Sequence, residues 1–305
     1  MKILAFGATG FVGKHLVPHL VDGGHQVTVA ARSGKAGFPP AVRVIKADPM
    51  TPGQWQDSVT DYDAVLNLAG TPISTRWTEA GKQSILESRM FSTRNIVDAL
   101  EKSPGKTFLC ANAVGFYGDC GDRLCAEDSH RGTGFLAEVA QAWQDEALRA
   151  SESGHRVVIP RLAVVLGDGG ALGKMVPPFS FGLGGRLGSG KQWFPWVHVQ
   201  DVVRIMRFLL ESPQASGIYN ACAPHPVTNA EFTSALGRAL HRPAVLPVPA
   251  FVLRLALGEA ADMLLGGQRC LPQKLQSLGF RFQYLDLDRA LAQIIPALKT
   301  SKHSD

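Results

Sequence analysis

Apolar residues follow two different spacings along the first 240 residues of the chain. Short apolar runs, typical of buried strands, lie at 3–6, 26–31, 42–45, 63–70, 107–111, 156–159 and 218–220. Residues at helical spacing lie at 15–21, 78–102, 134–151, 201–210 and 229–240. Strands that alternate with helices predict a parallel sheet with right-handed crossovers.

The later part of the chain has a different composition. From Gly167 to Gly190 glycines are crowded, and aromatic residues such as Phe179 and Trp193 lie among or just after them. This predicts a long, ordered loop over a ligand. Beyond Pro247 the pattern is helical to Leu298.

Three glycines spaced three residues apart follow the first predicted strand. Gly7 ends the strand in a turn that a Cβ atom would obstruct, Gly10 lets a diphosphate approach the backbone, and Gly13 lets the helix pack closely on the sheet. The N–H groups at the start of that helix favour phosphates. The predicted dinucleotide site comprises Gly7, Thr9, Gly10, Phe11, Val12 and Gly13.

The end of the second strand indicates which dinucleotide binds. An acidic residue there would accept hydrogen bonds from a free ribose 2′-hydroxyl, whereas an arginine pairs with a 2′-phosphate. Arg32 stands at this position, Ser33 can add a donor and Lys35 follows. We therefore expect NADP(H) rather than NAD(H). The alternative is that Arg32 is a solvated surface charge.

A second small-residue turn follows the buried run that starts at residue 63. It consists of Leu68, Ala69 and Gly70, and such a turn can lie under a nicotinamide ribose. With the alternation of strands and helices, the two turns predict an α/β fold, a Rossmann-type doubly wound parallel sheet. We expect a smaller C-terminal α/β lobe beside it.

Composition excludes several other classes of protein. The 305 residues contain 31 basic and 26 acidic side chains, a net charge of +5 that is scattered along the chain, so we expect no nucleic-acid partner. Five cysteines without a CxxC pair or a nearby histidine group predict neither a disulfide scaffold nor a metal site. No apolar stretch is typical of a signal peptide or a membrane span, so the expected location is the cytoplasm.

Several motifs resemble the extended short-chain dehydrogenase/reductases, in their nucleotide-sugar epimerase branch. They are the glycines at 7–13, NLAG at 67–70, FYGD at 116–119 and WVHVQDV at 196–202. The run at 182–202, ACAP at 221–224 and NAEF at 229–232 resemble more closely the atypical epimerase family labelled SDR39U1-like. Members of that family carry an added C-terminal segment of the DUF1731 type, here residues 247–296.

The resemblance sets the expected domain organisation. We expect an NADP-binding domain at 1–166 with returning segments from 196–225, a substrate-side lobe with the glycine-rich loop at 167–246, a C-terminal helical segment at 247–298 and a solvated tail at 299–305. In this superfamily subunits often pair through two helices, so a homodimer is one expectation. The residue pattern singles out no interface.

The chain departs from the superfamily in its catalytic residues. The usual chemistry uses a tyrosine and, four residues later, a lysine that lowers the pKa of the tyrosine. None of the tyrosines Tyr62, Tyr117, Tyr219 and Tyr284 has a lysine four residues on. The matching helix carries Phe135 and Val139, and Asn112 stands at the usual hydroxyl position. Either another residue acts as the general acid, or the substrate receives its proton from solvent.

Few residues can replace the missing pair. Asn112, Tyr117 and His198 are the candidate catalytic residues, and Glu138 is titratable but expected to be exposed. Tyr117 has packing as its alternative role. His198 has as its alternative a structural role together with Asp201, which we expect to bond the neighbouring backbone.

Three basic residues could bind an anionic group of the substrate: Arg161, Lys174 and Lys191. We also expect Arg161 to belong to the cofactor site.

Two functions are consistent with these features. One is an NADP(H)-dependent oxidoreductase or epimerase with a small-molecule substrate that the sequence does not identify. The other is a non-catalytic NADP(H)-binding module that a protein partner recognises. The aromatic residues of the glycine-rich loop favour the enzyme.

Overall fold

The computed structural model describes residues 1–301, with the side chains of residues 1–298. The chain forms two compact units, each built from three separate segments. The first unit contains Met1–Phe116, Phe135–Arg161 and Val203–Tyr219, and the second contains Tyr117–Gly134, Leu162–Val202 and the residues from Asn220 onward.

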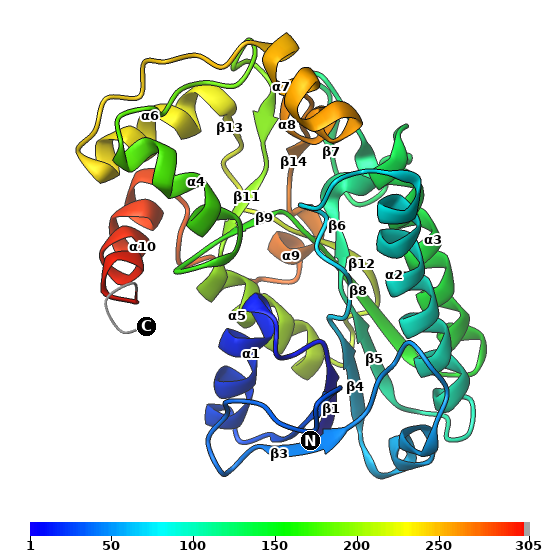
Figure 1. The fold of residues 1–305 in the computed structure, drawn as a ribbon. Helices are drawn as coiled ribbons and strands as arrows, with labels where there is room; N and C mark the ends of the chain where they lie inside the picture. Colours follow the sequence, from blue (N-terminus) through cyan, green and yellow to red (C-terminus); the bar gives the residue numbers. More distant parts are fainter. Residues whose placement is uncertain (302–305) are drawn as a thin grey trace. The chain divides into compact units, whose positions relative to one another are not determined.

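The first unit is built on a sheet with strand order β12-β8-β5-β4-β1-β2-β3, with β6 beside β8 (Figure 1). The pairings from β8 through β3 are parallel. The strand order reverses between β1 and β4, and ligands of such sheets bind at this point, beyond the carboxyl ends of the strands. The strands are β1 (Lys2–Phe6), β2 (Gln26–Ala31), β3 (Arg43–Lys46), β4 (Ala64–Asn67), β5 (Thr107–Cys110), β6 (Asn112–Ala113), β8 (Arg156–Leu162) and β12 (Gly217–Ala221).

Helices cover both faces of this sheet. In Figure 1 α2 and α3 lie side by side on one face, while α1 and α5 lie on the other. Their bounds are α1 (Phe11–Asp22), α2 (Glu79–Leu100), α3 (Phe135–Glu152) and α5 (Val199–Glu211), and the 3₁₀ helices are η1 (Gln54–Asp61) and η2 (Val114–Tyr117). The structure thus confirms the predicted doubly wound parallel sheet.

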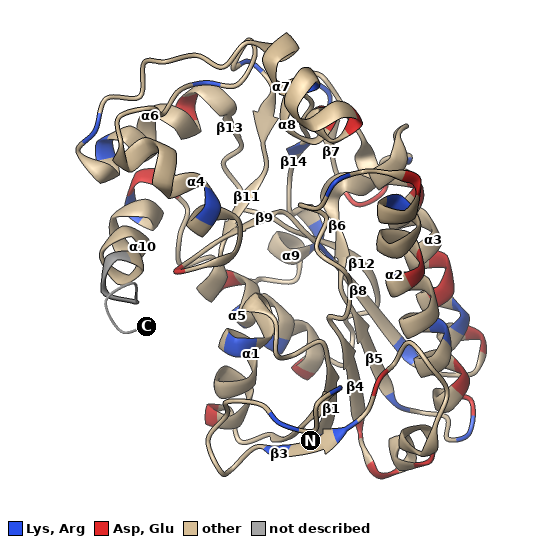
Figure 2. Ribbon diagram, viewed as in Figure 1, with Lys and Arg blue, Asp and Glu red and all other residues tan. Residues whose placement is uncertain are grey.

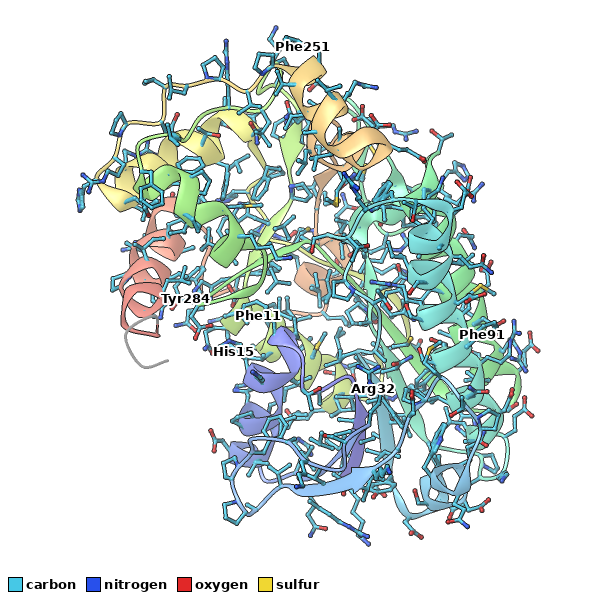
Figure 3. All side chains as sticks on the ribbon, viewed as in Figure 1. Phe11, His15, Arg32, Phe91, Phe251 and Tyr284 are labelled. Atoms are coloured by element: carbon cyan, nitrogen blue, oxygen red, sulfur yellow. The ribbon has the colours of Figure 1, made fainter. Side chains whose placement is uncertain are left out.

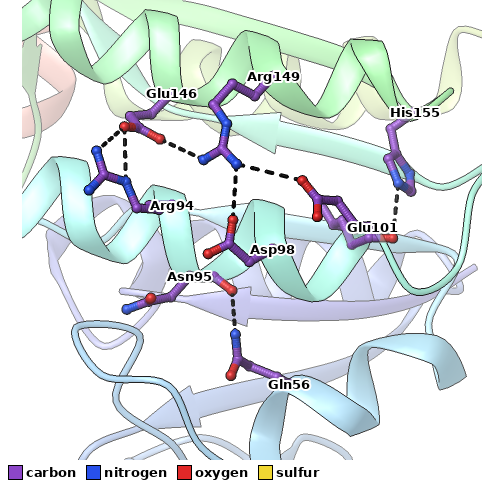
Figure 4. Close-up of polar contacts among 9 residues, drawn as sticks. Gln56, Arg94, Asn95, Asp98, Glu101, Glu146, Arg149 and His155 are labelled. Carbon is purple, nitrogen blue, oxygen red and sulfur yellow. Dashed lines mark hydrogen bonds and ion pairs between the residues drawn. The ribbon is translucent and has the colours of Figure 1, made fainter.

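An ion-pair network joins α2 to α3 (Figure 4). Glu146 accepts hydrogen bonds from Arg94 and from Arg149, whose Nη1 lies 3.0 Å from Oε2. Arg149 also reaches Asp98 on α2, with 3.1 Å between Nη2 and Oδ1. Figure 2 shows basic and acidic residues gathered on these two helices.

A buried histidine supports the far end of the same helix pair. His155 lies just after α3; its Nε2 is 3.0 Å from the carbonyl oxygen of Leu100, at the end of α2 (Figure 4). Its Nδ1 accepts a hydrogen bond from the N–H of Lys106. Because Nδ1 accepts, Nε2 carries the proton and donates it to Leu100. Burial lowers the pKa of His155, which agrees with this neutral form.

The second unit contains short strand pairs and helices. Its strands are β7 (Leu124–Cys125), β9 (Val164–Leu166), β10 (Trp193–Phe194), β11 (Trp196–His198), β13 (Val227–Thr228) and β14 (Arg269–Cys270). Its helices are α4 (Gly170–Ser180), α6 (Asn229–Leu240), α7 (Ala250–Leu257), η3 (Gly258–Ala261), α8 (Asp262–Leu265), α9 (Gln273–Ser277) and α10 (Leu287–Ser301). The buried faces of α4, α6 and α10 form one core around Trp196.

Two predictions about this unit were wrong in detail. The glycine-rich stretch expected to be a loop contains α4, whose buried face is formed by Leu172, Val176 and Phe179. Its glycines and its two prolines concealed that spacing. The stretch expected to be helical from Pro247 to Leu298 is broken by β14 and by irregular backbone at 278–286. Helix α10 extends to Ser301, and the rest of the predicted tail lies outside the described residues.

Candidate functional site

The turn between β1 and α1 has the geometry expected of a dinucleotide site. Gly7 has φ +70°, and a Cβ atom there would lie 2.4 Å from the backbone of Leu68 and Ala69. A Cβ atom on Gly13 would lie 2.2 Å from the carbonyl oxygen of Ala8. On Gly10 it would meet only the carbonyl oxygen of Gly7, at 3.2 Å. Gly7 and Gly13 are therefore required by the fold, whereas Gly10 leaves space open at the turn.

Helix α1 presents its first N–H groups at this turn. Its first backbone hydrogen bond runs from Lys14 N to Gly10 O at 2.9 Å, so the N–H groups of residues 11–13 precede it. The first turn contains no acidic residue. Thr9 is exposed, and Phe11 and Val12 are partly exposed. This helix start can bind a diphosphate.

Arg32 directly follows β2 and is exposed at the carboxyl end of the sheet, near the start of α1 (Figure 3). Ser33 accepts a hydrogen bond from the N–H of Lys35 and donates to its carbonyl oxygen. Lys46, which the sequence reasoning missed, ends β3 in register with Ala31. Two basic residues thus stand at neighbouring strand ends. The end of the third apolar run was the signal that could have identified Lys46.

The second small-residue turn is fixed by Asn67 at the end of β4. Asn67 Oδ1 accepts from the N–H of Ala69 at 3.0 Å, and its Nδ2 donates to Thr93 of α2 at 2.9 Å. Leu68 and Ala69 are partly exposed and Gly70 is exposed. The turn packs against Gly7, so the two predicted turns do come together.

Arg89 of α2 is a further basic residue beside this turn. Its Nη1 donates to the carbonyl oxygens of Thr71 and Ile85, both at 3.0 Å, and its guanidinium lies over the ring of Trp143 of α3. Burial lowers the pKa of Arg89 to about 10. No sequence motif pointed to this residue, because an arginine on an amphipathic helix is usually on its solvated face.

Phe135 and Val139, the residues expected at the positions of the usual tyrosine and lysine, both lie on α3. Phe135 begins α3, its ring packs edge-on against Trp77 with centroids 5.1 Å apart, and Lys82 Nζ lies 5.8 Å from its ring centroid. Val139, one turn later, is buried. The amide of Asn112 donates to Ala140 O at 2.9 Å and accepts from the N–H of Ala113 at 2.7 Å. These contacts give Asn112 a structural role; its catalytic role remains a prediction.

Arg161 is 1% exposed inside the first unit. Its Nη2 donates to Gln144 Oε1 at 2.7 Å, and its guanidinium stacks on Phe116 with 3.4 Å between Cζ and the ring centroid. The contacts tie α3 to β8. Cofactor or anion binding by Arg161 therefore remains a prediction that these contacts do not support.

Tyr117 belongs to the second unit and is fully buried. Its hydroxyl donates to Asn220 Oδ1 at 2.7 Å. Asn220 in turn donates to the carbonyl oxygens of Cys125 and Leu271. This environment supports the alternative packing role, and the role of Tyr117 as an acid stays a prediction.

His198, also in the second unit, is 1% exposed. Its ring stacks on Tyr284 at 3.7 Å, Nδ1 accepts from the N–H of Gln200, and Nε2 lies 2.8 Å from Gln293 Oε1. Asp201 accepts from the N–H groups of residues 283 and 284, both at 2.8 Å. Asp201 thus has a structural role, but it bonds a segment far away in the sequence instead of the neighbouring backbone that was expected. The candidate role of His198 in catalysis stays a prediction.

The remaining polar candidates are exposed. Glu138 is exposed on α3, as expected. Lys174 on α4 and Lys191 in the following loop are exposed in the second unit. Among the described residues no cluster of histidine, cysteine, aspartate or glutamate has the arrangement of a metal site. Within the same part of the chain no helix is long and apolar enough to cross a membrane.

The sheet order and the glycine turn at its switch point define a dinucleotide-binding protein of the Rossmann type. A profile described as the NAD dependent epimerase/dehydratase family matches residues 3–222, and DUF1731, a domain of unknown function, matches residues 248–294. The chain belongs to this epimerase/dehydratase family and, within it, to the SDR39U1-like epimerase proteins. The predicted family resemblance is thus confirmed.

The similarity to individual relatives extends over almost the whole chain. The chloroplastic SDR39U1 homolog of Arabidopsis thaliana is 40% identical over 97% of this chain and 87% of that protein. The epimerase family protein YfhF of Bacillus subtilis is 39% identical over 98% of this chain and all of that protein. The crystal structure of human SDR39U1 with NADPH has 33% identity and a TM-score of 0.85, over 96% of this chain and 99% of that one.

Proposed function

We propose that the protein is an NADP(H)-dependent oxidoreductase or epimerase-like enzyme. The observation that carries this proposal is the position of Arg32 and Lys46 at the carboxyl ends of neighbouring strands, beside the glycine turn. Two cations at this point favour a cofactor with a 2′-phosphate. The human relative solved with NADPH supports the same choice.

Each part of the cofactor has residues suited to hold it. The N–H groups at the start of α1 bind the diphosphate, and Arg32 with Lys46 binds the 2′-phosphate. The turn formed by Leu68, Ala69 and Gly70 supports the nicotinamide ribose. When bound, the cofactor supplies or accepts a hydride.

The first unit offers positive charge where the usual tyrosine is missing. Phe135 cannot donate a proton, but Lys82 and Arg89 of α2 both face the aromatic residues of α3. In our proposal Lys82 would donate a proton to the substrate oxygen, and Arg89 would stabilise negative charge that develops there.

Turnover of NADPH tests the proposal. A panel of nucleotide sugars and small carbonyl compounds is incubated with the protein, and NADPH loss is followed by absorbance. Once a substrate is found, we expect Lys82→Met to lower kcat about 100-fold, with NADPH affinity unchanged. Lys102→Met, a change at an exposed lysine of the same unit, is the control and should leave kcat unchanged. Tight NADPH binding without turnover of any compound in the panel would contradict the proposal that the protein is an enzyme.

A second candidate is a non-catalytic NADP(H)-binding module, which is favoured by the apolar packing of Trp77 on Phe135 at the position of the catalytic tyrosine. In that case cofactor occupancy stabilises a conformation that a protein partner recognises. Arg32→Glu would then change the proteins that copurify as well as the affinity for NADPH. If the same proteins copurify with Arg32→Glu as with the wild type, this second candidate function is contradicted.

A further inference from the structure

Three cysteine side chains of the second unit lie together around the β7–β14 pair. The two strands are parallel, with Cys125 and Cys270 in register. Cys120 lies in the turn before β7, and its Sγ is 2.7 Å from that of Cys125. A disulfide bond has a sulfur–sulfur distance of about 2.0 Å. The two thiols are therefore close enough to bond with a small adjustment of side chains.

The backbone of this turn is already fixed in place. The N–H of Cys120 donates to Gly267 O at 3.0 Å, and the N–H of Gly267 donates to Asp119 Oδ1 at 3.2 Å. The side-chain amide of Gln268 donates to Gly118 O at 2.6 Å. These bonds hold Cys120 beside Cys125 in the folded protein, without help from a covalent link.

The sulfur atoms differ in their access to solvent. Cys120 is partly exposed, whereas Cys125 and Cys270 are buried. A small oxidant in solution therefore reaches Cys120 first. The buried Cys125 thiol lies next to Cys120, in the position of a resolving thiol, which would attack an oxidised Cys120 and form the disulfide.

We propose that Cys120 and Cys125 form a reversible disulfide by exchange with a low-molecular-weight disulfide such as oxidised glutathione. The Cys120 thiolate attacks one glutathione sulfur, and the first glutathione leaves as a thiolate. The Cys125 thiolate then attacks Cys120 Sγ of this mixed disulfide and releases the second glutathione. The protein loses two electrons and two protons, which the glutathione disulfide gains as it becomes two thiols.

The surroundings of the pair make this exchange slow at neutral pH. The contact with Cys125 and burial raise the pKa of Cys120, although Arg123 acts in the opposite direction. At Cys125 the hydrogen bond with Cys120 lowers the pKa, but Cys270 and burial outweigh it and raise the pKa to about 12. Only a small fraction of either thiol is ionised, so the protein must be equilibrated for long periods in the redox buffer.

Tryptic peptide mapping of the folded full-length protein tests the proposal directly. Protein is equilibrated in glutathione buffers of increasing oxidised fraction, free thiols are alkylated, and the protein is digested without reduction. Cleavage after Arg123 separates the two cysteines: Cys120 falls in peptide 107–123 and Cys125 in peptide 124–131. We expect these two peptides to become linked, with loss of two hydrogens, and to separate again on reduction.

Matched variants identify the sulfur atoms involved. Peptide 107–123 also contains Cys110, which is buried in the first unit. Cys110→Ser should keep the linkage, and Cys120→Ser should abolish it. Alkylation of all five cysteines in the most oxidising buffer would overturn the proposal. So would linkage of 124–131 to peptide 270–274, which carries Cys270, or loss of the linkage in Cys110→Ser.

Discussion

At the residue scale, the three glycines of the first turn have separable roles. A side chain at Gly7 or Gly13 would collide with backbone atoms, whereas one at Gly10 would enter the open space where we propose that the diphosphate binds. These roles could be predicted from the sequence, because strand, glycine spacing and helix all constrain the same few atoms.

Alanine substitutions separate folding from binding. Gly13→Ala places a Cβ atom 2.2 Å from Ala8 O, so we expect it to reduce the free energy of unfolding by about 2–3 kcal/mol. Gly10→Ala should have a free energy of unfolding within about 1 kcal/mol of that of the wild type. It should bind NADPH at least about 10-fold more weakly, because its Cβ atom would enter the space proposed for the diphosphate. Denaturant midpoints and calorimetric titration measure the two effects. Equal stability of both variants would contradict this division of roles.

The candidate acids show that a sequence does not reveal the surroundings of a titratable side chain. Tyr117 and His198 were selected as titratable residues near familiar motifs, yet both are buried within the second unit among hydrogen-bonding side chains. A sequence shows that a residue can titrate but not which partners its polar atoms find. Lys82 and Arg89 were missed for the converse reason, because only the packing of α2 on α3 shows that they face aromatic rings.

At the element scale, Glu146 holds α2 and α3 together. Its side chain is 10% exposed and accepts hydrogen bonds from two arginines. Burial alone would raise the pKa of Glu146, but the hydrogen bonds from Arg94 and Arg149 outweigh burial and lower it. The carboxylate therefore stabilises the folded protein above the pKa of an unfolded glutamate, about 4.3. That contribution is lost as pH falls through the lowered pKa.

Glu146→Gln tests this role. At pH 7 we expect the free energy of unfolding to fall by about 1–3 kcal/mol, because two arginines lose a partly buried charged partner. The difference from the wild type should shrink as pH falls below about 4. Asp57→Asn, which removes an exposed ion pair with Lys102, should cost less than about 1 kcal/mol. A difference for Glu146→Gln that stays constant with pH would contradict the ion-pair explanation.

The elements themselves were predictable to different degrees. The longer strands and the α-helices of the first unit were recovered to within a few residues, apart from the start of α1, because their hydrophobic periods are regular. The two-residue strand β6 and the 3₁₀ helices η1 and η2 were not predicted. Helix α4 was not, since glycines and prolines interrupt its apolar face. The short strand β14 has only two residues and depends on pairing with β7, far away in the sequence, so no local pattern identifies it.

At the scale of the whole molecule, the family match and the sheet topology both indicate a Rossmann-type protein of the epimerase/dehydratase family. The epimerase/dehydratase profile spans residues 3–222, and the DUF1731 profile covers most of the remaining chain. The residues proposed to hold the cofactor, at positions 7–13, 32, 46 and 68–70, all lie in the first unit. The substrate end could not be predicted, because none of the four tyrosines is followed by a lysine at the fourth position, so the motif that would mark it is missing from the sequence.

We propose that the first unit selects NADP(H) through the basic residues at the ends of β2 and β3. Isothermal titration calorimetry of NADPH and NADH with the wild type, Arg32→Glu and Arg43→Glu tests it most directly. Arg43 is an exposed arginine at the opposite end of β3, about 10 Å from the carboxyl edge. We predict that the wild type prefers NADPH, that Arg32→Glu weakens NADPH about 10- to 100-fold with little effect on NADH, and that Arg43→Glu changes neither affinity. Equal affinity of the wild type for both nucleotides, or equal losses in the two variants, would contradict the account.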